Sequence, residues 1–269
     1  MNTISFMTAN YVAREVGYQM TRGWGQGDKA TNEAFRPIEQ FGPRFETILQ
    51  EARDMGFKAI DLWLAHLSPN WATDEHVSTA RRLLDQYELS VVSFAGWFGS
   101  TPEEFEKSCQ MALQFGSPVL GGGTSMLEKD RPFVVETLQR HGLKLGLENH
   151  PEKTPQVMLD KVGDGGGGTI GVTVDTGWFG TQGYPADRAV EELQNVLFHV
   201  HLKDVHPGSE HRTCRYGEGI VPLQSVVATL QRIGYDGAIS VEHEPELFDP
   251  TQDIIASLAL LRGWLPEAR

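Results

Sequence analysis

Four apolar stretches in the second half of the chain each end in a side chain that can bind a metal ion or transfer a proton. Their apolar character is typical of buried β-strands. In chain order the terminal side chains are Glu148, Asp175, His201 and Glu242. Carboxylates that converge repel one another, and a bound cation relieves that repulsion. We therefore expect a divalent metal site if the fold brings these four strand ends together.

Three carboxylates and one imidazole suit a hard or borderline divalent ion. Mn²⁺ is the leading choice, with Mg²⁺ or Co²⁺ as alternatives. A structural zinc site is disfavoured because cysteine takes no part. The chain has two cysteines, Cys109 and Cys214, which are far apart and have no metal-type spacing.

Strand-like and helix-like segments alternate along the whole chain. The expected strands cover residues 3–9, 58–64, 89–95, 118–122, 143–149, 169–175, 196–202 and 238–242. The expected helices cover about 43–56, 73–87, 101–116, 128–141, 154–162, a stretch from 185, 222–233 and 252–264. Eight such units predict an α/β fold, a single (β/α)₈ TIM barrel of parallel strands over residues 1–269. An open, doubly wound sheet is the alternative.

A long segment separates the first strand from the first expected helix. Residues 10–42 are rich in glycine and polar residues, and Trp24 lies between Gly23 and Gly25. A loop of this length inside a compact domain is commonly a functional lid. We expect the segment to cover the carboxyl-end face of the barrel and the next helix to begin at Pro43.

Composition limits the classes of protein to which the chain can belong. The 269 residues are 40% hydrophobic and 22% charged, which is typical of a folded globular protein. A net charge of −13 argues against nucleic-acid binding. No apolar run approaches the ~18 residues of a membrane helix, and the N-terminus does not have the pattern of a secretory signal. With its few cysteines, the chain is expected to be cytoplasmic, without membrane or nucleic-acid partners.

The four strand ends resemble those of the xylose-isomerase-like barrels, a superfamily of sugar isomerases, epimerases and related lyases. The resemblance rests on Leu-Glu148-Asn-His, Val-Asp175-Thr-Gly, His201-Leu-Lys-Asp and Val-Glu242-His-Glu, with a weaker match at Gly217-Glu-Gly219. It covers essentially the whole chain. It implies that these four residues bind the metal and that Glu148 and Glu242 also form an acid/base pair on opposite faces of a sugar. If the metal ties up both glutamates, His150 or His66 is the alternative base.

One position departs from the family pattern. Many epimerases of the family carry a substrate-contacting histidine three residues after the aspartate, where this chain has Trp178. An apolar ring there, with Trp24, Trp63 and Trp97 near the same mouth, suits a substrate with an aromatic or bulky portion. Further candidates for substrate binding are Lys203, which could instead pair with Asp204, and two arginines of the loop after the seventh strand, Arg212 and Arg215.

The resemblance implies that the protein removes a proton from the carbon next to a keto-sugar carbonyl. Reprotonation would make it an isomerase or epimerase, and expulsion of a substituent would make it a lyase, such as an inosose dehydratase. Residues 7–11 and 23–28 also resemble the catalytic subunit of C-glycoside deglycosidases, which release an aromatic aglycone from a 3-keto glycoside. We narrowly favour this lyase. A second, non-identical subunit and a homo-oligomer both stay open. The family's DNA endonucleases are disfavoured by the acidic charge.

Overall fold

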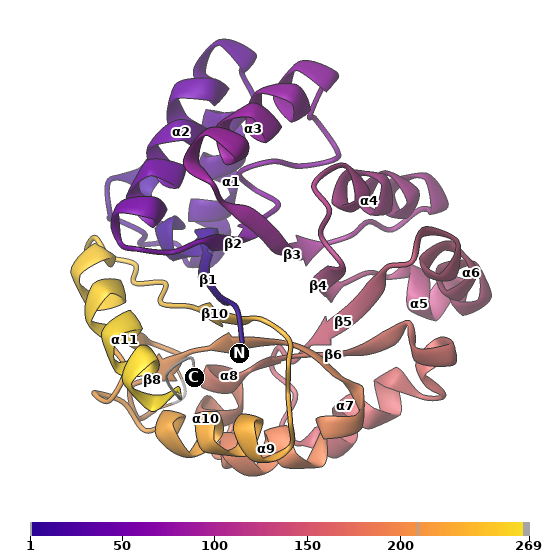
Figure 1. Cartoon of the computed structure of the whole chain (residues 1–269), viewed down its shortest axis with the longest axis vertical. Coiled ribbons are helices and arrows are strands. Elements are labelled where there is room, and N and C mark those ends of the chain that lie inside the picture. The colour runs from indigo at the N-terminus through magenta and orange to yellow at the C-terminus, as the bar shows by residue number, and fades with distance from the viewer. Residues whose placement is uncertain (1, 209, 266–269) are drawn as a thin grey trace.

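Eight parallel strands close into a barrel in the computed structural model of the protein, which describes residues 2–208 and 210–265. Around the barrel the strands follow the order β1-β10-β7-β6-β5-β4-β3-β2. Because β1 pairs with both β10 and β2, the sheet has no free edge and the barrel prediction is confirmed over the open sheet. Figure 1 shows the helices as an outer ring.

The barrel strands are short, apolar and almost fully buried, as expected where helices cover the outside and side chains fill the interior. Their bounds are β1 (Ile4–Met7), β2 (Ala59–Trp63), β3 (Ser90–Trp97), β4 (Val119–Gly123), β5 (Lys144–Glu148), β6 (Ile170–Asp175), β7 (Leu197–Leu202) and β10 (Ile239–Val241). A separate antiparallel pair, β8 (Asp204–Val205) and β9 (Thr213–Cys214), follows β7.

Most helices begin within a few residues of the predicted positions. They are α1 (Trp24–Phe35), α2 (Ile38–Asp54), α3 (Asp74–Tyr87), α4 (Pro102–Gln114), α5 (Met126–Lys129), α6 (Arg131–His141), α7 (Pro155–Val162), α8 (Thr176–Thr181), α9 (Ala186–Glu192), α10 (Leu223–Arg232) and α11 (Thr251–Trp264). At the start of α4, Thr101 Oγ1 accepts the Glu104 N–H while the Glu104 side chain accepts the Thr101 N–H. This reciprocal capping explains why the sequence located that helix well.

The segment after β1 is more ordered than the sequence suggested. It holds two 3₁₀ turns, η1 (Thr8–Tyr11) and η2 (Arg14–Val16), then α1 and the start of α2. Helix α2 begins at Ile38 instead of Pro43, because buried Phe41 stacks on Phe45 with ring centroids 5.2 Å apart and extends the apolar face upstream.

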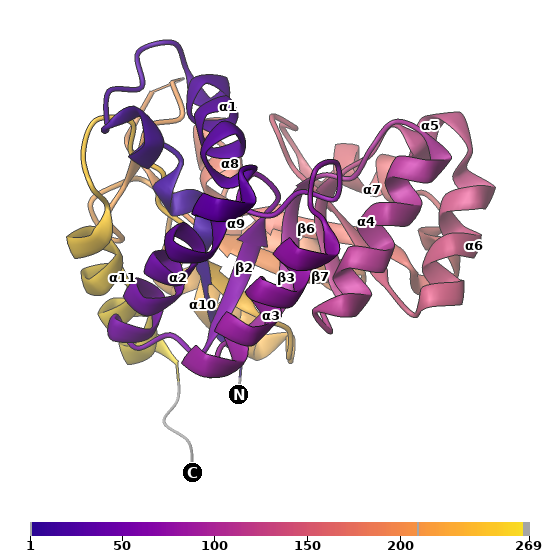
Figure 2. The same ribbon diagram turned by 90° about the horizontal axis from the view of Figure 1, so that it is seen from above.

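Helix α1 lies directly against the chain that leaves β1. A Cβ on Gly27 would stand 2.3 Å from the carbonyl oxygen of Val12, so this contact requires glycine. In Figure 2, α1 lies on the side toward which the β2 arrow points, and the N-terminus lies on the opposite side. The segment therefore borders the carboxyl-end face of the barrel. Among residues 2–208 and 210–265, no helix has the length and apolar character to cross a bilayer.

Candidate metal centre and active site

The four predicted ligands come from neighbouring positions at the carboxyl ends of consecutive barrel strands. Glu148 and Asp175 are the last residues of β5 and β6, His201 is the penultimate residue of β7, and Glu242 follows β10. In the β6–β7 register, Asp175 pairs with His201. Glu148, His201 and Glu242 line a cavity of about 1490 Å³.

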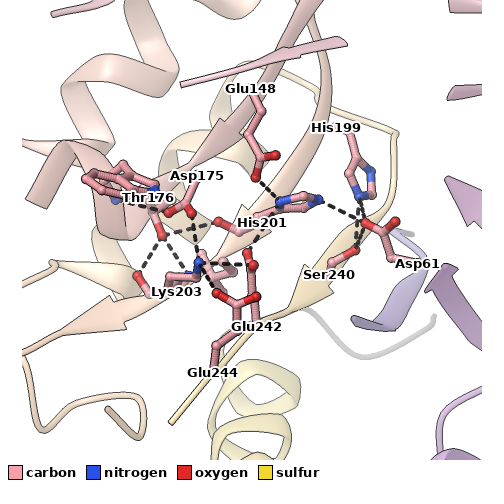
Figure 3. A network of polar contacts seen from close by, with 12 residues as sticks. Asp61, Glu148, Asp175, Thr176, His199, His201, Lys203, Ser240, Glu242 and Glu244 are labelled. Carbon is pink, nitrogen blue, oxygen red and sulfur yellow. Dashed lines mark hydrogen bonds and ion pairs between the residues drawn. The ribbon is translucent and has the colours of Figure 1, made fainter. Parts of the chain in front are cut away.

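His201 lies between two glutamates. Its Nδ1 atom is 2.5 Å from Glu148 Oε1 and 3.3 Å from Glu242 Oε2 (Figure 3). The three side chains offer ligand atoms that all lie within 4.8 Å of one another. Glu148 belongs to a second such set with His150 and Asp175. The four predicted ligands thus occupy two overlapping groups that share Glu148.

A buried ammonium group lies on the other side of the carboxylates. Lys203 Nζ is 3.0 Å from Asp175 Oδ2, 3.0 Å from Glu242 Oε1 and 3.1 Å from Glu244 Oε2. Burial would lower the pKa of Lys203, but these carboxylates, Asp175 foremost, raise it well above its ordinary value. Lys203 is therefore a fixed positive charge at the base of the cavity.

The neighbouring Asp204 has a different role from Lys203. Its carboxylate accepts the backbone N–H groups of Gly217, Gly219 and Val221, at 2.9, 3.1 and 3.0 Å. A Cβ on Gly219 would stand 2.2 Å from Asp204 Oδ1, so the close approach of this loop requires glycine. Asp204 therefore holds the loop that contains the Gly-Glu-Gly sequence and does not pair with Lys203.

The carboxyl groups of the site have different proton affinities. Burial raises the pKa of Glu242 well above its ordinary value, and the charges of Glu244 and Asp175 add to this effect. Burial would also raise the pKa of Glu148, but His150 and His201 hold it below the ordinary value. Burial would raise the pKa of Asp175 too, but neighbouring positive charge, chiefly that of Lys203, lowers this pKa to about 2. Two carboxyl groups with opposite shifts are typical of an acid/base pair.

The donor set fits a divalent cation. Asp175 Oδ2 and Glu242 Oε2 are buried and accept no well-aligned hydrogen bond from the described residues, although Lys203 Nζ lies 3.0 Å from the first and His201 Nδ1 lies 3.3 Å from the second. Asp175, Glu242 and Glu244 contact the ammonium group of Lys203, and Glu148 adds a fourth carboxylate beside His201, so acidic groups outnumber this ammonium group at the site. Carboxylate oxygens together with imidazole are ligands that Mn²⁺, Mg²⁺ or Co²⁺ accept.

A buried network beneath His201 was not expected from the sequence. Asp61 Oδ2, from the middle of β2, lies 3.0 Å from His201 Nε2, 2.7 Å from His199 Nε2 and 2.8 Å from Ser240 Oγ. Burial would raise the pKa of Asp61, but His199 and His201 lower it below its ordinary value. The sequence feature that could have indicated this network is the single aspartate within the apolar run Ala-Ile-Asp-Leu-Trp.

The opposite wall of the cavity is aromatic. Trp24, Trp63 and Trp97 line it, and the Trp24 and Trp63 rings meet edge-on with centroids 5.1 Å apart. Trp24 is 43% exposed and Trp97 is 56% exposed, so both present apolar surface to the cavity. Trp24 Nε1 also lies 3.3 Å from Glu244 Oε1, which connects the first βα segment to the acidic cluster.

Trp178 lines the cavity, but one face of its ring is covered. His211 stacks on it with centroids 3.8 Å apart and an interplanar angle of 9°. His211 Nδ1 lies 2.7 Å from Thr181 Oγ1, while its buried Nε2 has no hydrogen-bond partner within residues 2–208 and 210–265. Burial, aided by Lys203, lowers the pKa of His211 to about 4. The sequence did not indicate that His211 belongs to the site, because only the folding of the β8–β9 hairpin brings it against α8.

The two candidate histidine bases lie in different surroundings. His150 lines the cavity and its Nε2 is 3.4 Å from Glu148 Oε1. His66 is 2% exposed, contacts the Phe35 ring edge-on, lies 3.1 Å from the Thr8 hydroxyl and is not among the residues that line the cavity. Burial, aided by Arg14, lowers the pKa of His66 to about 3. His150 is therefore placed near the carboxylates and His66 is not.

The two candidate arginines also differ in position. Arg212 lines the cavity, with its Nε 3.3 Å from Glu210 Oε2. Arg215 forms an ion pair with Glu218 and does not line the cavity. Arg212 is thus the one that can reach a molecule in the cavity.

The protein is a single parallel barrel with a buried acid–imidazole cluster at its carboxyl-end face that could hold a metal ion, and the sequence comparison specifies the family. The chain belongs to the xylose isomerase-like TIM barrel family, which matches residues 49–264. An uncharacterized protein of Methanocaldococcus jannaschii is 35% identical over 141 residues, which are 49% of this chain and 46% of that protein. The match thus spans about half the length of that relative.

Solved structures with the same fold cover most of the chain. L-Ribulose 3-epimerase has a TM-score of 0.68 at 16% identity, over 98% of this chain and 95% of that one. A 3-keto-D-glucoside 4-epimerase from E. coli has a TM-score of 0.63 at 18% identity, over 81% and 94%. A probable 3-DHS dehydratase from Bacillus anthracis has a TM-score of 0.65 at 17% identity, over 97% and 99%. At these identities the likeness establishes the fold.

Proposed function

We propose that the protein is an enzyme that holds a divalent cation with Glu148, Asp175, His201 and Glu242 and removes a proton next to a keto-sugar carbonyl. The observation that carries this proposal is the cluster of Glu148, His201 and Glu242 at one wall of the cavity. A divalent ion bound there, with Mn²⁺ as the first choice, stabilises the negative charge that develops on the substrate oxygen.

The side chains around the cluster have complementary tasks. Glu148, whose pKa is lowered, is ionised and can accept the proton from carbon. Glu242, whose pKa is raised, can hold a proton and return it. If both glutamates serve as ligands, His150 is the base, because it lines the cavity 3.4 Å from Glu148. Lys203 and Arg212 can contact the oxygens of the substrate.

The aromatic wall favours an elimination that releases an aromatic group. A cavity of about 1490 Å³ exceeds the ~300–1,000 Å³ of common ligand sites and leaves room beyond one sugar ring. In a 3-keto C-glycoside, the C2–H and C1–aryl bonds break and a C1=C2 double bond forms. The base takes the C2 proton, and the aryl carbon takes a proton from an acid such as Glu242. Trp24 and Trp97 would contact the departing ring, as would the part of Trp178 that lines the cavity beside His150.

Epimerisation or isomerisation of a ketose is the second candidate. The raised pKa of Glu242 and the lowered pKa of Glu148 support it, since one glutamate can remove a proton from carbon and the other return it. The two named epimerases and the named dehydratase with this fold show that barrels of this shape support both outcomes. An inosose dehydratase-like elimination of water belongs with this alternative.

The test offers both substrate types to one protein preparation. Purified protein with Mn²⁺ in D₂O receives a 3-keto C-glycoside or a free ketose, and chromatography and mass spectrometry follow the products. Aglycone release supports the lyase, and deuterium in an epimerised or isomerised sugar supports the alternative. A sample stripped with EDTA is the control. If neither substrate type exchanges a proton in metal-loaded protein, the proposed proton abstraction is wrong.

A further inference from the structure

We propose that Asp61 is a positioning residue that fixes the His201 imidazole so that its Nδ1 atom, and not Nε2, serves the metal centre. The inference rests on the metal site of the proposed function and adds a residue to it. Asp61 lies on β2, which β1 and β10 separate from β7 around the barrel, and it does not line the cavity. Of the four predicted ligands, the described contacts of Asp61 include His201 alone. Its effect would pass through His201 alone.

The geometry links the two ends of one imidazole to different carboxylates. His201 Nε2 lies 3.0 Å from Asp61 Oδ2, and Nδ1 lies 2.5 Å from Glu148 Oε1. Figure 3 shows Glu148, His201 and Asp61 in a row, with the ring in the middle. A neutral imidazole has one N–H and one lone pair. Without a cation, the contact with the Glu148 carboxylate places a proton on Nδ1, because an ionised carboxylate only accepts hydrogen bonds. A bound cation would replace that proton. If Nε2–H donates to Asp61, the Nδ1 lone pair is then the one offered to the cation.

Burial makes this orientation rigid. Asp61 is 0% exposed and His201 is 1% exposed, so water cannot replace either partner. His199 Nε2 and the Ser240 hydroxyl lie 2.7 and 2.8 Å from the same Asp61 oxygen and hold the carboxylate in place. Metal-binding histidines usually donate their second N–H to such a carboxylate, which fixes the tautomer and raises the basicity of the ligand.

The network could instead be a metal site of its own, because Asp61, His199 and His201 also offer ligand atoms within 4.8 Å of one another. Hydrogen bonds already account for Asp61 Oδ2 and His199 Nε2, while Asp61 Oδ1 is left without a partner among the described residues. Ser240 donates to Asp61 Oδ2, and Ser93 Oγ lies 3.1 Å from His199 Nε2. Neither Asp61 nor His199 lines the cavity. The arrangement therefore fits the support of a ligand better than a second ion.

The test measures metal affinity, so it needs no knowledge of the substrate. Wild type, Asp61→Asn and Ser93→Ala are stripped with EDTA and titrated with Mn²⁺ by calorimetry. Asp61→Asn keeps the shape but removes the charged acceptor. We expect it to weaken Mn²⁺ binding about 10-fold or more, the usual effect of losing such a partner. Ser93→Ala is the matched control. It removes one hydroxyl from the same buried network without touching His201, and its affinity should stay within about twofold of wild type.

A spectroscopic measurement on the wild type covers the case in which Asp61→Asn does not fold. With ¹⁵N-labelled histidine and ¹¹³Cd²⁺, His201 should carry its proton on Nε2 and show coupling between Nδ1 and cadmium. Equal Mn²⁺ affinity in wild type and Asp61→Asn, or a proton on Nδ1, would overturn the role of Asp61. Failure of the wild type to bind any of these ions would overturn the metal site itself and this proposal with it.

Discussion

Two halves of the cavity face one another with different chemistry. The half formed by the ends of β5, β6, β7 and β10, called the charged half, carries Glu148, Asp175, His201, Lys203 and Glu242. The half formed by the ends of β2 and β3 together with α1, called the aromatic half, carries Trp63, Trp97 and Trp24. The charged half has the groups to which the proposed function assigns the proton transfers, and the aromatic half has the apolar surface that can select a substrate by shape.

This division gives a rule for substitutions. A change in the charged half should affect every substrate alike, because each substrate shares the proton abstraction. A change in the aromatic half should affect only substrates that have an aromatic or bulky portion. If substitutions in the two halves changed the rates of all substrates in the same way, the assignment of different tasks to the two halves would be wrong.

The largest effect is expected in the charged half. Glu148→Gln removes a carboxylate that lies 2.5 Å from His201 and belongs to both ligand groups. Loss of a general base costs about 10²–10⁴-fold in rate. We expect kcat/KM to fall by about that factor for a glycoside and a ketose alike, as measured by initial rates in Mn²⁺. A loss confined to one substrate type would contradict the shared role of Glu148.

The second-largest effect is expected at His66, beneath the aromatic half, and it concerns the pH dependence of folding stability. His66 is neutral in the folded protein, since its pKa is lowered from 6.5 to about 3. Unfolded chains bind a proton there below pH 6.5, so the stability contributed by this site is complete above 6.5 and is lost as the pH falls toward 3. Each pH unit in that window costs about 1.4 kcal/mol.

Urea unfolding at several pH values checks this expectation. Between pH 6.5 and 5, the wild type should lose about 2 kcal/mol more of its free energy of unfolding than His66→Gln loses. Equal pH slopes would show that His66 is not the buried neutral group described here. A loss of turnover in His66→Gln without a change in slope would return His66 to the list of candidate bases.

The smallest effect is expected at Trp97, which is 56% exposed on the aromatic half. Trp97→Ala removes one aromatic face, and such contacts contribute about 0.5–1.5 kcal/mol. KM for a substrate with an aromatic portion should rise about fivefold, while KM for a free ketose should stay unchanged. Arg215→Ala, at a half-exposed position outside the cavity, is the control and should leave both values as they are.

The sequence predicted the charged half better than the aromatic half for a physical reason. An apolar strand that ends in Glu148 or Asp175 is a local pattern, and a parallel barrel brings such ends together without further information. Helix α1 has no side-chain cap and contains two glycines after Trp24, so its local signal was weak. It depends on packing of Gly27 against Val12, which only the fold reveals.

The residues missed in the site depend on long-range contacts. Asp61 bonds to His201, which is 140 residues away, so no spacing in the sequence marks the pair. His211 reaches Thr181 through the β8–β9 hairpin, and its stacking on Trp178 was equally hidden. Conversely, His66 follows β2 as a strand-end residue should, but its ring packs against Phe35 instead of facing the cavity.

Anomalous diffraction from crystals soaked in Mn²⁺ tests the central claim most directly, because it locates the ion without a substrate. We predict a single strong peak at the charged half, about 2.0–2.6 Å from Glu148, Glu242 and His201 Nδ1. The same map decides whether Asp175 completes the ligand set. A peak between Asp61 and His199 would contradict the proposed ligand set, and no peak in protein that retains its fold would contradict the proposal of a metal-dependent enzyme.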